Sequence, residues 1–243
     1  MNPLIIDTTI NTHSPIIVAL DYNNEHDVMN FVAKIDPSLC RLKVGKELFT
    51  SCGPKLVEKL VISGYDVFLD LKFHDIPNTV YKACKAASQL GIWMLNVHIS
   101  GGSEMLKSAK QAIDESLNKP LLIGVTVLTS HGQEVLHEIG IHDNLESHVV
   151  KLAKLAFNNQ LDGVVCSALE SKIIKANTAD TFLTITPGIR LTTNKTDDQT
   201  RIVTPKQALV DHKVDYMVIG RPITQAEDPY TVLNEIKTQL DYY

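Results

Sequence analysis

Residues 66–73 read DVFLDLKF and have the character of a β-strand that is covered on both faces. The run is short, nearly continuous in apolar character as far as Asp70, and bounded by polar or turn residues. Seven further runs of the same kind recur along the chain, at residues 16–21, 41–45, 94–99, 121–128, 163–167, 182–187 and 216–220. The sequence therefore predicts eight short strands.

Longer stretches with helical spacing separate these runs, because apolar residues recur there at the i, i+3, i+4, i+7 positions of one helix face. The clearest sets are Val28, Phe31, Val32 and Ile35; Leu56, Val57, Leu60 and Val61; and Leu145, Val149, Leu152, Ala153 and Ala156. Asn144 is expected to cap the third of these helices, and a closing helix is predicted over residues 229–240. Pro54, Pro77 and Pro205 stand where first helical turns are expected to begin.

Eight strands that alternate with helices predict the α/β class and a (β/α)8 TIM barrel. We expect a single domain over residues 1–243, with the barrel proper at about 15–240, since barrels of this kind run to about 250 residues. The alternative is an open, doubly wound sheet. It is weakened because no GxGxxG turn follows the first apolar run.

The composition bears on whether the protein binds nucleic acid or a membrane. The net charge is −5 and the basic residues are scattered, so neither a nucleic-acid surface nor a membrane surface is expected. The N-terminus lacks a signal-peptide pattern, and no run of about 20 apolar residues is present, which predicts a cytoplasmic protein. Reduced thiols in or near the core are expected for the four cysteines, Cys40, Cys52, Cys84 and Cys166.

Charged residues at strand ends are the candidate catalytic groups, because barrel active sites form at the C-terminal ends of the strands. Asp70 and Lys72 lie two residues apart in one strand, so both side chains are expected on the face at the barrel mouth. Lys43 lies inside a neighbouring apolar strand and can join them in one charge cluster. A purely structural ion pair would leave the same pattern at Asp70 and Lys72.

Other strand ends carry further candidates. Asp21 ends the first strand and His98 the fourth, although an Asp at this place is as often a helix cap. Arg190 follows the seventh strand, and Gly220 and Arg221 follow the eighth. Loops after the last two strands commonly bind phosphate in barrels, where Gly permits close approach and Arg binds phosphate oxygens.

Six segments together resemble the orotidine 5′-phosphate decarboxylase family, from about residue 16 to the C-terminal helix. The most specific is a DxKxxD pattern formed by Asp70, Lys72 and Asp75, which continues as Ile-Pro-Asn-Thr at residues 76–79. The other segments are ALD at 19–21, LKVG at 42–45, VHISGG at 97–102, TPGIR at 186–190 and VIGRPI at 218–223. The bacterial stand-alone form is the most similar.

The resemblance implies that the chain removes CO2 from orotidine 5′-phosphate to give UMP, in de novo pyrimidine biosynthesis, with no metal and no cofactor. It implies a charged tetrad of Lys43, Asp70, Lys72 and Asp75, in which Asp75 comes from the other subunit of a homodimer. Lys72 is then expected to stabilise the C6 carbanion and to donate the proton that ends the reaction.

The resemblance also implies a set of substrate-binding residues. These are Asp21, Lys43, Thr79, Thr129, Ser130, Pro187, Arg190, Gln199, Gly220 and Arg221. Within this set, Asp21 and Lys43 would hold ribose hydroxyls and Ser130 the pyrimidine. Gln199, Gly220 and Arg221 would hold the 5′-phosphate, and Thr79 would cross the dimer interface.

Three alternatives stay open from the sequence. Sugar-phosphate decarboxylases and hexulose-phosphate synthases share the barrel and the DxKxxD pattern, but they use Mg2+ and would have an acidic residue in place of Lys43. A barrel that binds a phosphorylated ligand without catalysis would be expected to lack Lys72 or Asp75. A metal site at the histidines is disfavoured by their irregular spacing; these are His131, His137, His142 and His148.

Overall fold

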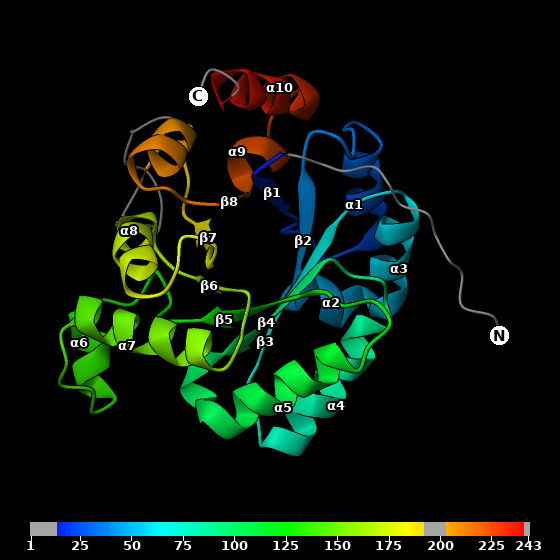
Figure 1. Cartoon of the computed structure of the whole chain (residues 1–243). Coiled ribbons are helices and arrows are strands. Elements are labelled where there is room, and N and C mark those ends of the chain that lie inside the picture. Colours follow the sequence, from blue (N-terminus) through cyan, green and yellow to red (C-terminus); the bar gives the residue numbers. More distant parts are fainter. Residues whose placement is uncertain (1–13, 192–202, 241–243) are drawn as a thin grey trace.

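A computed structural model describes residues 14–191 and 203–240 of the chain. Its eight strands form a closed barrel in which each strand pairs in parallel with the next, and β8 pairs back to β1 (Figure 1). The strands are β1 (Ile16–Ala19), β2 (Arg41–Gly45), β3 (Val67–Phe73), β4 (Met94–His98), β5 (Leu121–Val125), β6 (Gly163–Val165), β7 (Leu183–Pro187) and β8 (Tyr216–Ile219). The predicted (β/α)8 barrel is confirmed.

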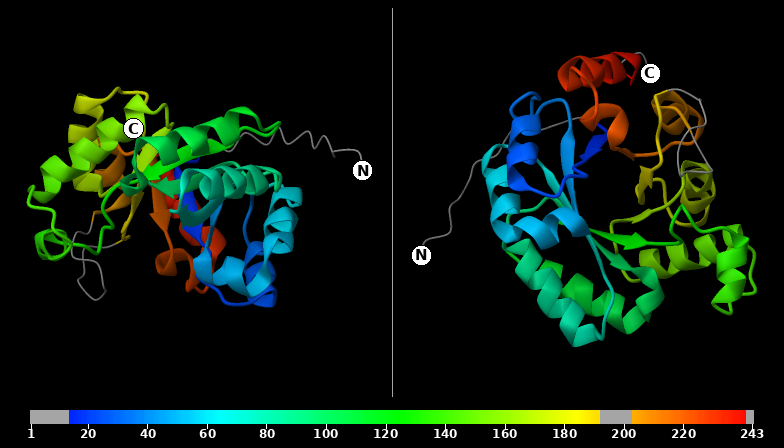
Figure 2. Two further views of the ribbon diagram at one scale, coloured as in Figure 1. Left: turned by 90° about the horizontal axis from the view of Figure 1, so that it is seen from below. Right: turned by 180° about the vertical axis from the view of Figure 1, so that it is seen from behind.

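Helices lie around the outside of this ring of strands, as Figures 1 and 2 show from three directions. The α-helices are α1 (Glu25–Val32), α2 (Lys46–Cys52), α3 (Pro54–Ile62), α4 (Pro77–Ser88), α5 (Gly102–Asp114), α6 (Gln133–Glu138), α7 (Leu145–Asn158), α8 (Ala168–Asn177), α9 (Arg221–Thr224) and α10 (Pro229–Leu240). A 3-10 turn, η1 (Ile99–Gly101), and a π-helix, η2 (Gln207–Asp211), complete the set. The apolar faces that the sequence predicts for α1, α3 and α7 pack against the core, and most of their residues are buried. Val61, Leu145 and Leu152 are half-buried at the edges of these faces.

Local chemistry explains where several elements begin and end. The Asn144 side chain accepts a hydrogen bond from the N–H of Ser147 at 2.8 Å, so the predicted cap of α7 is confirmed. Strand β5 ends at Val125, earlier than predicted. Beyond this end, both the backbone N–H and the hydroxyl of Thr126 donate to the Val165 carbonyl, at 3.3 and 2.8 Å. The helix predicted after Pro205 becomes π-helical over Gln207–Asp211.

The middle of the barrel interior is a packed core, and a cavity lies at the C-terminal ends of the strands. Seven buried apolar side chains fill its middle: Ile17, Ala19, Phe68, Met94, Ile123, Ile185 and Val218. Below them, the Arg41 guanidinium lies 4.5 Å from the centre of the Trp93 ring and 5.1 Å from that of Tyr216. Arg41 also pairs with Asp66 at 3.2 Å. These four side chains form a floor at the N-terminal end of the barrel, and the candidate site lies at the opposite end.

Gly163 is required by the close contact between β6 and β7. A Cβ atom at this position would lie 2.3 Å from the carbonyl oxygen of Leu183, the residue that faces it in register. We expect Gly163→Ala to lower the free energy of unfolding by about 1–3 kcal/mol or more, because the two strands must move apart. Urea denaturation measures this difference.

Gly132→Ala is the matched control, since the Cβ there would meet only the end of the exposed Glu134 side chain, which can swing aside. Equal urea midpoints for the two variants would contradict the predicted clash at Gly163.

Candidate active site

A cavity of about 590 Å³ opens at the C-terminal ends of the strands. Its walls come from residues spaced two apart in the strands, because alternate side chains of a strand point to the same face. Asp70 and Lys72 of β3 follow this pattern, as do Lys43 and Gly45 of β2. The cavity therefore gathers the ends of strands that are far apart in the sequence, as predicted.

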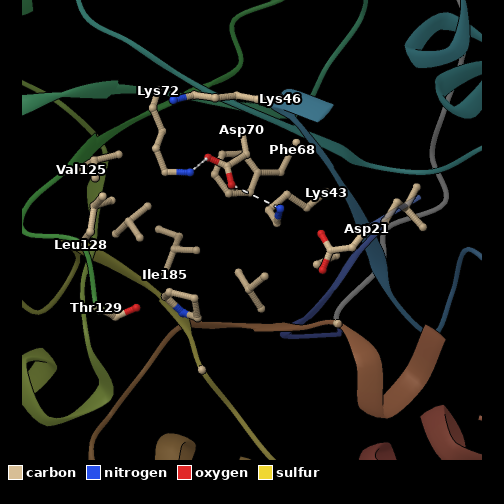
Figure 3. A pocket seen from close by; sticks show the side chains of 18 of the residues that line it. Asp21, Lys43, Lys46, Phe68, Asp70, Lys72, Val125, Leu128, Thr129 and Ile185 are labelled. Atoms are coloured by element: carbon tan, nitrogen blue, oxygen red, sulfur yellow. Dashed lines mark hydrogen bonds and ion pairs between the residues drawn. The ribbon is translucent and has the colours of Figure 1, made fainter. Parts of the chain in front are cut away.

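Lys43, Asp70 and Lys72 form a continuous row of alternating charge on the cavity wall. The Lys72 Nζ lies 2.6 Å from Asp70 Oδ1, and the Lys43 Nζ lies 3.3 Å from Asp70 Oδ2. Figure 3 shows the two lysines reaching the Asp70 carboxylate from opposite sides. Each carboxylate oxygen thus faces its own ammonium group, and the predicted charge cluster of these three residues forms.

The charge of Asp70 is stabilised by its neighbours. Burial alone would raise the pKa of Asp70, but Lys43, Lys72 and a hydrogen bond from Asn96 outweigh it, and the pKa falls below its ordinary value. Asp70 is therefore ionised at neutral pH.

The backbone of β3 is irregular at Lys72, which simple strand alternation did not predict. Lys72 has a φ of 52°, in the left-handed region that residues other than glycine seldom adopt. The register between β3 and β4 also shifts between Leu69 and Phe73. Asn96 of β4 receives the N–H of Lys72 on its side-chain oxygen at 2.8 Å. Sequence analysis missed Asn96; its only signal was a polar residue two positions before His98 in an apolar strand.

His98 lines the cavity beside this cluster as a neutral group. Its pKa is lowered to about 4, first by burial and then by His74, Lys46 and Lys72 nearby. The His74 and His98 rings lie 5.6 Å apart between centroids. A neutral imidazole can donate one hydrogen bond and accept another at the cavity wall, but it adds no charge there.

Asp75 and Thr79 do not reach the cavity of their own chain. Both are exposed, and the Asp75 carboxylate accepts a hydrogen bond from the N–H of Ile76 at 2.6 Å. Ile76 between them is also exposed, at 65%. Within the described chain, the fourth member of the predicted tetrad is thus separate from the other three.

Most of the remaining predicted residues do line the cavity. They are Asp21, Thr129, Ser130, Pro187, Arg190, Gly220 and Arg221. Gly220 approaches the first strand closely, because a Cβ there would lie 3.1 Å from Asp21 Oδ2. Gln199 lies outside the described residues.

The cavity is positively charged although the chain carries a net charge of −5. Five basic residues line it against three acidic ones: Lys43, Lys46, Lys72, Arg190 and Arg221, against Asp21, Glu47 and Asp70. Lys46 and Glu47, at the start of α2, were not predicted as site residues. Such a surplus of positive charge in a concave site favours an anionic ligand.

The described residues also bear on metal sites, membrane spans and the cysteines. Among the residues that the structure describes, no group of three or more His, Cys, Asp or Glu side chains is placed to hold a metal ion. None of the described helices has the length and apolar character that a membrane span requires. All four cysteines are free, three of them buried and Cys52 half-buried.

Comparison with known proteins assigns this arrangement to a family. Residues 14–236 match the family described as Orotidine 5'-phosphate decarboxylase / HUMPS. The chain belongs to this family. Among its relatives, an orotidine 5'-phosphate decarboxylase of Saccharophagus degradans is 54% identical over 225 residues, which cover 93% of this chain and 94% of the relative. One from Neisseria meningitidis serogroup A is 51% identical over 97% of this chain and 96% of its own length.

Solved structures of the family have the same barrel. The crystal structure of orotidine 5'-phosphate decarboxylase from Lactobacillus acidophilus is similar with a TM-score of 0.84 and 41% identity, and the match covers 93% of this chain and 99% of that one. An uncharacterized conserved protein from Geobacillus kaustophilus is similar with a TM-score of 0.81 and 38% identity, at the same coverage. The predicted family and fold are therefore confirmed.

Proposed function

We propose that the chain decarboxylates orotidine 5′-phosphate to UMP and CO2 in pyrimidine biosynthesis. The observation that carries this proposal is the row of Lys43, Asp70 and Lys72 in a positively charged cavity of about 590 Å³. That volume suits one small-molecule ligand. The row would supply the cation that a metal-free decarboxylation needs.

Lys72 is proposed to carry the chemistry. Loss of CO2 leaves an electron pair on C6 of the pyrimidine, and this carbon has no conjugated group that accepts the pair. A fixed ammonium beside C6 stabilises the developing charge, and the same ammonium then donates its proton to C6. Because Asp70 holds the Lys72 Nζ at 2.6 Å, the cation is in place before the substrate arrives.

Asp70 also places a negative charge near the carboxylate of the substrate. Two unit charges 4 Å apart interact by about 4 kcal/mol at an effective dielectric constant of 20. Enzymes typically lower their barriers by about 8–23 kcal/mol, so this repulsion is too small to be the main effect. Stabilisation of the carbanion by Lys72 is therefore the larger proposed contribution.

The other cavity residues are proposed to hold the nucleotide. Arg221 and the backbone at Gly220 would bind the 5′-phosphate after β8, together with Gln199 and with Pro187 and Arg190 after β7. Asp21 and Lys43 would bind ribose hydroxyls at the ends of β1 and β2. Ser130, with Thr129 before it, would bind the pyrimidine. This arrangement would direct C6 toward Lys72.

A homodimer is proposed to complete the site. The exposed segment from Asp75 to Thr79 leaves the mouth of the barrel, where a second copy of the chain can accept it. Asp75 would then approach Lys72 of the other subunit and add the fourth charge of the tetrad. We also propose that residues 1–243 form one domain and that the reaction uses no metal and no cofactor.

The direct test of this function is turnover of orotidine 5′-phosphate in excess EDTA, followed by its ultraviolet absorbance. We expect rapid conversion to UMP at the same rate with and without EDTA, because Lys72 supplies the positive charge that a metal would otherwise provide. A control with added Mg2+ is expected to give the same rate.

The same assay distinguishes the proposed decarboxylase from its main alternative, a metal-dependent sugar-phosphate enzyme. Metal-dependent sugar-phosphate enzymes of related sequence would be inactive on orotidine 5′-phosphate, or would require Mg2+ for their own substrates. Absence of conversion by the pure, folded protein would refute the proposed decarboxylase activity and leave the family and fold standing.

A further inference from the structure

Asn96 is a buried polar residue whose side chain crosses from β4 to the catalytic strand β3. It is only 1% exposed, and it lies in an otherwise apolar strand that reads MLNVH. Its amide makes two hydrogen bonds: Oδ1 accepts from the backbone N–H of Lys72 at 2.8 Å, and Nδ2 donates to Asp70 Oδ1 at 2.7 Å. Both bonds end on residues of the charge row.

These two bonds require the chemistry of a neutral amide. One end of the side chain must accept and the other must donate, so a single orientation of the amide satisfies both partners. An ionised carboxylate would lose the donor and repel Asp70, while an apolar side chain would leave a buried N–H and a buried carboxylate oxygen with one partner fewer. Asn is therefore matched to this place.

The bond to Lys72 replaces a regular strand contact. Leu69 pairs with Leu95 and Phe73 pairs with Val97. Between these two pairs, β3 advances by four residues while β4 advances by two. The chain between these pairs contains Asp70 and Lys72, and Lys72 has its φ of 52° there. An irregularity of this kind re-aims side chains at a strand end. Asn96 holds the N–H at its centre.

The bond to Asp70 sets the rotation of the carboxylate. Oδ1 receives both the Asn96 amide and the Lys72 ammonium, which leaves Oδ2 for Lys43 at 3.3 Å. Without the amide, the carboxylate can turn and take Lys72 with it. A side chain that fixes both the backbone and the partner of Lys72 determines where its ammonium lies.

We propose that Asn96 is a positioning residue that places the Lys72 ammonium against the reacting carbon of the substrate. The inference rests on the proposed decarboxylase activity. It predicts that Asn96→Ala lowers kcat by about 100-fold, since a displacement of about 1 Å at a reacting group has effects of this size. KM and the affinity for UMP are expected to change by less than about threefold, because Asn96 does not line the cavity and reaches the proposed ribose ligand Lys43 only through Asp70.

The pH profile of kcat distinguishes a positioning role of Asn96 from a role in stability alone. The charged and titratable groups that face Asp70 are Lys43 from β2, Lys72 from β3 and the neutral His98 from β4. The hydrogen bond from Asn96 helps to lower the pKa of Asp70, so its removal raises that pKa. The acidic limb of the kcat profile should therefore move to higher pH in Asn96→Ala.

Thr184→Val is the matched control. Thr184 is also fully buried in a strand, and its hydroxyl bonds to Asp215 at 2.9 Å and to Ser171 at 3.0 Å, away from the cavity. We expect this variant to lose thermal stability as Asn96→Ala does but to keep the wild-type kcat and pH profile. A kcat of Asn96→Ala within threefold of that of Thr184→Val would overturn the inference.

Asn96→Asp serves as the test if Asn96→Ala does not fold. A neutral Asp side chain has a donor and an acceptor like the amide, whereas the ionised form has no donor. We expect kcat of Asn96→Asp to fall with rising pH over a range in which the wild type is constant. Profiles that run parallel would overturn the inference. Lack of activity in the wild type itself would instead refute the proposed function.

Discussion

Lys72→Ala is expected to lower kcat by at least about 10⁴-fold, the largest effect of any substitution in the cavity. General acid catalysis contributes about 10²–10⁴-fold and a preorganised charge about 10²–10³-fold, and the proposed mechanism takes both from one ammonium. The variant removes the stabilising charge and the proton donor together. Stopped or continuous absorbance assays with orotidine 5′-phosphate measure the loss.

Binding of UMP provides the internal check on this variant. The phosphate and ribose contacts do not involve Lys72, so calorimetry should still detect UMP binding in Lys72→Ala. Lys46→Ala is the matched control, because Lys46 is a second lysine on the same wall, beside Lys72 in Figure 3. We expect it to lower kcat by no more than about tenfold, since it lies outside the charge row. Equal losses in the two variants would contradict a specific role for Lys72.

Mixing two inactive variants is expected to restore activity. Asp75→Ala and Lys72→Ala should each be nearly inactive alone. In a dimer of one copy of each, one site lacks both groups, and the other combines an intact Lys72 with an intact Asp75 from its partner. Random exchange of subunits in a two-fold dimer therefore predicts about a quarter of the wild-type activity. The assay is performed after co-refolding of equal amounts.

The same experiment distinguishes where Asp75 acts. If Asp75 served the cavity of its own chain, both sites of the mixed dimer would be defective and no activity would return. Mixing Lys72→Ala with Asp70→Asn provides the control, because both groups lie in one cavity and no intact site can form. Recovery in this control would contradict the proposed sharing of sites.

The sequence predicts the barrel well because each strand is a short apolar run and each helix carries an apolar face. It also predicts the meeting of Lys43, Asp70 and Lys72, since charged residues at the ends of neighbouring parallel strands have to share one mouth. Strand ends were less accurate. Strand β5 ends at Val125 although the apolar run continues to Leu128, so hydrophobic periodicity alone did not locate its end.

Some features of the site depend on contacts between residues that are far apart in the sequence or in different chains. The left-handed backbone of Lys72 has no local cause such as glycine; it accompanies a register shift and the bond from Asn96, 24 residues away along the chain. Asp75 does not line the cavity of its own chain, and the partner proposed for it is Lys72 of a second copy of the chain. Sequence patterns of one chain do not encode either relation directly.

Arg41 contacts Trp93, Tyr216 and Asp66 at the N-terminal end of the barrel, opposite the cavity. The proposed substrate and UMP would then both use the opening at the C-terminal ends of the strands, and a bound nucleotide would block the next substrate. UMP should accordingly compete with orotidine 5′-phosphate for the cavity when its concentration rises. Accumulated UMP would thus lower the rate of decarboxylation without a separate regulatory site.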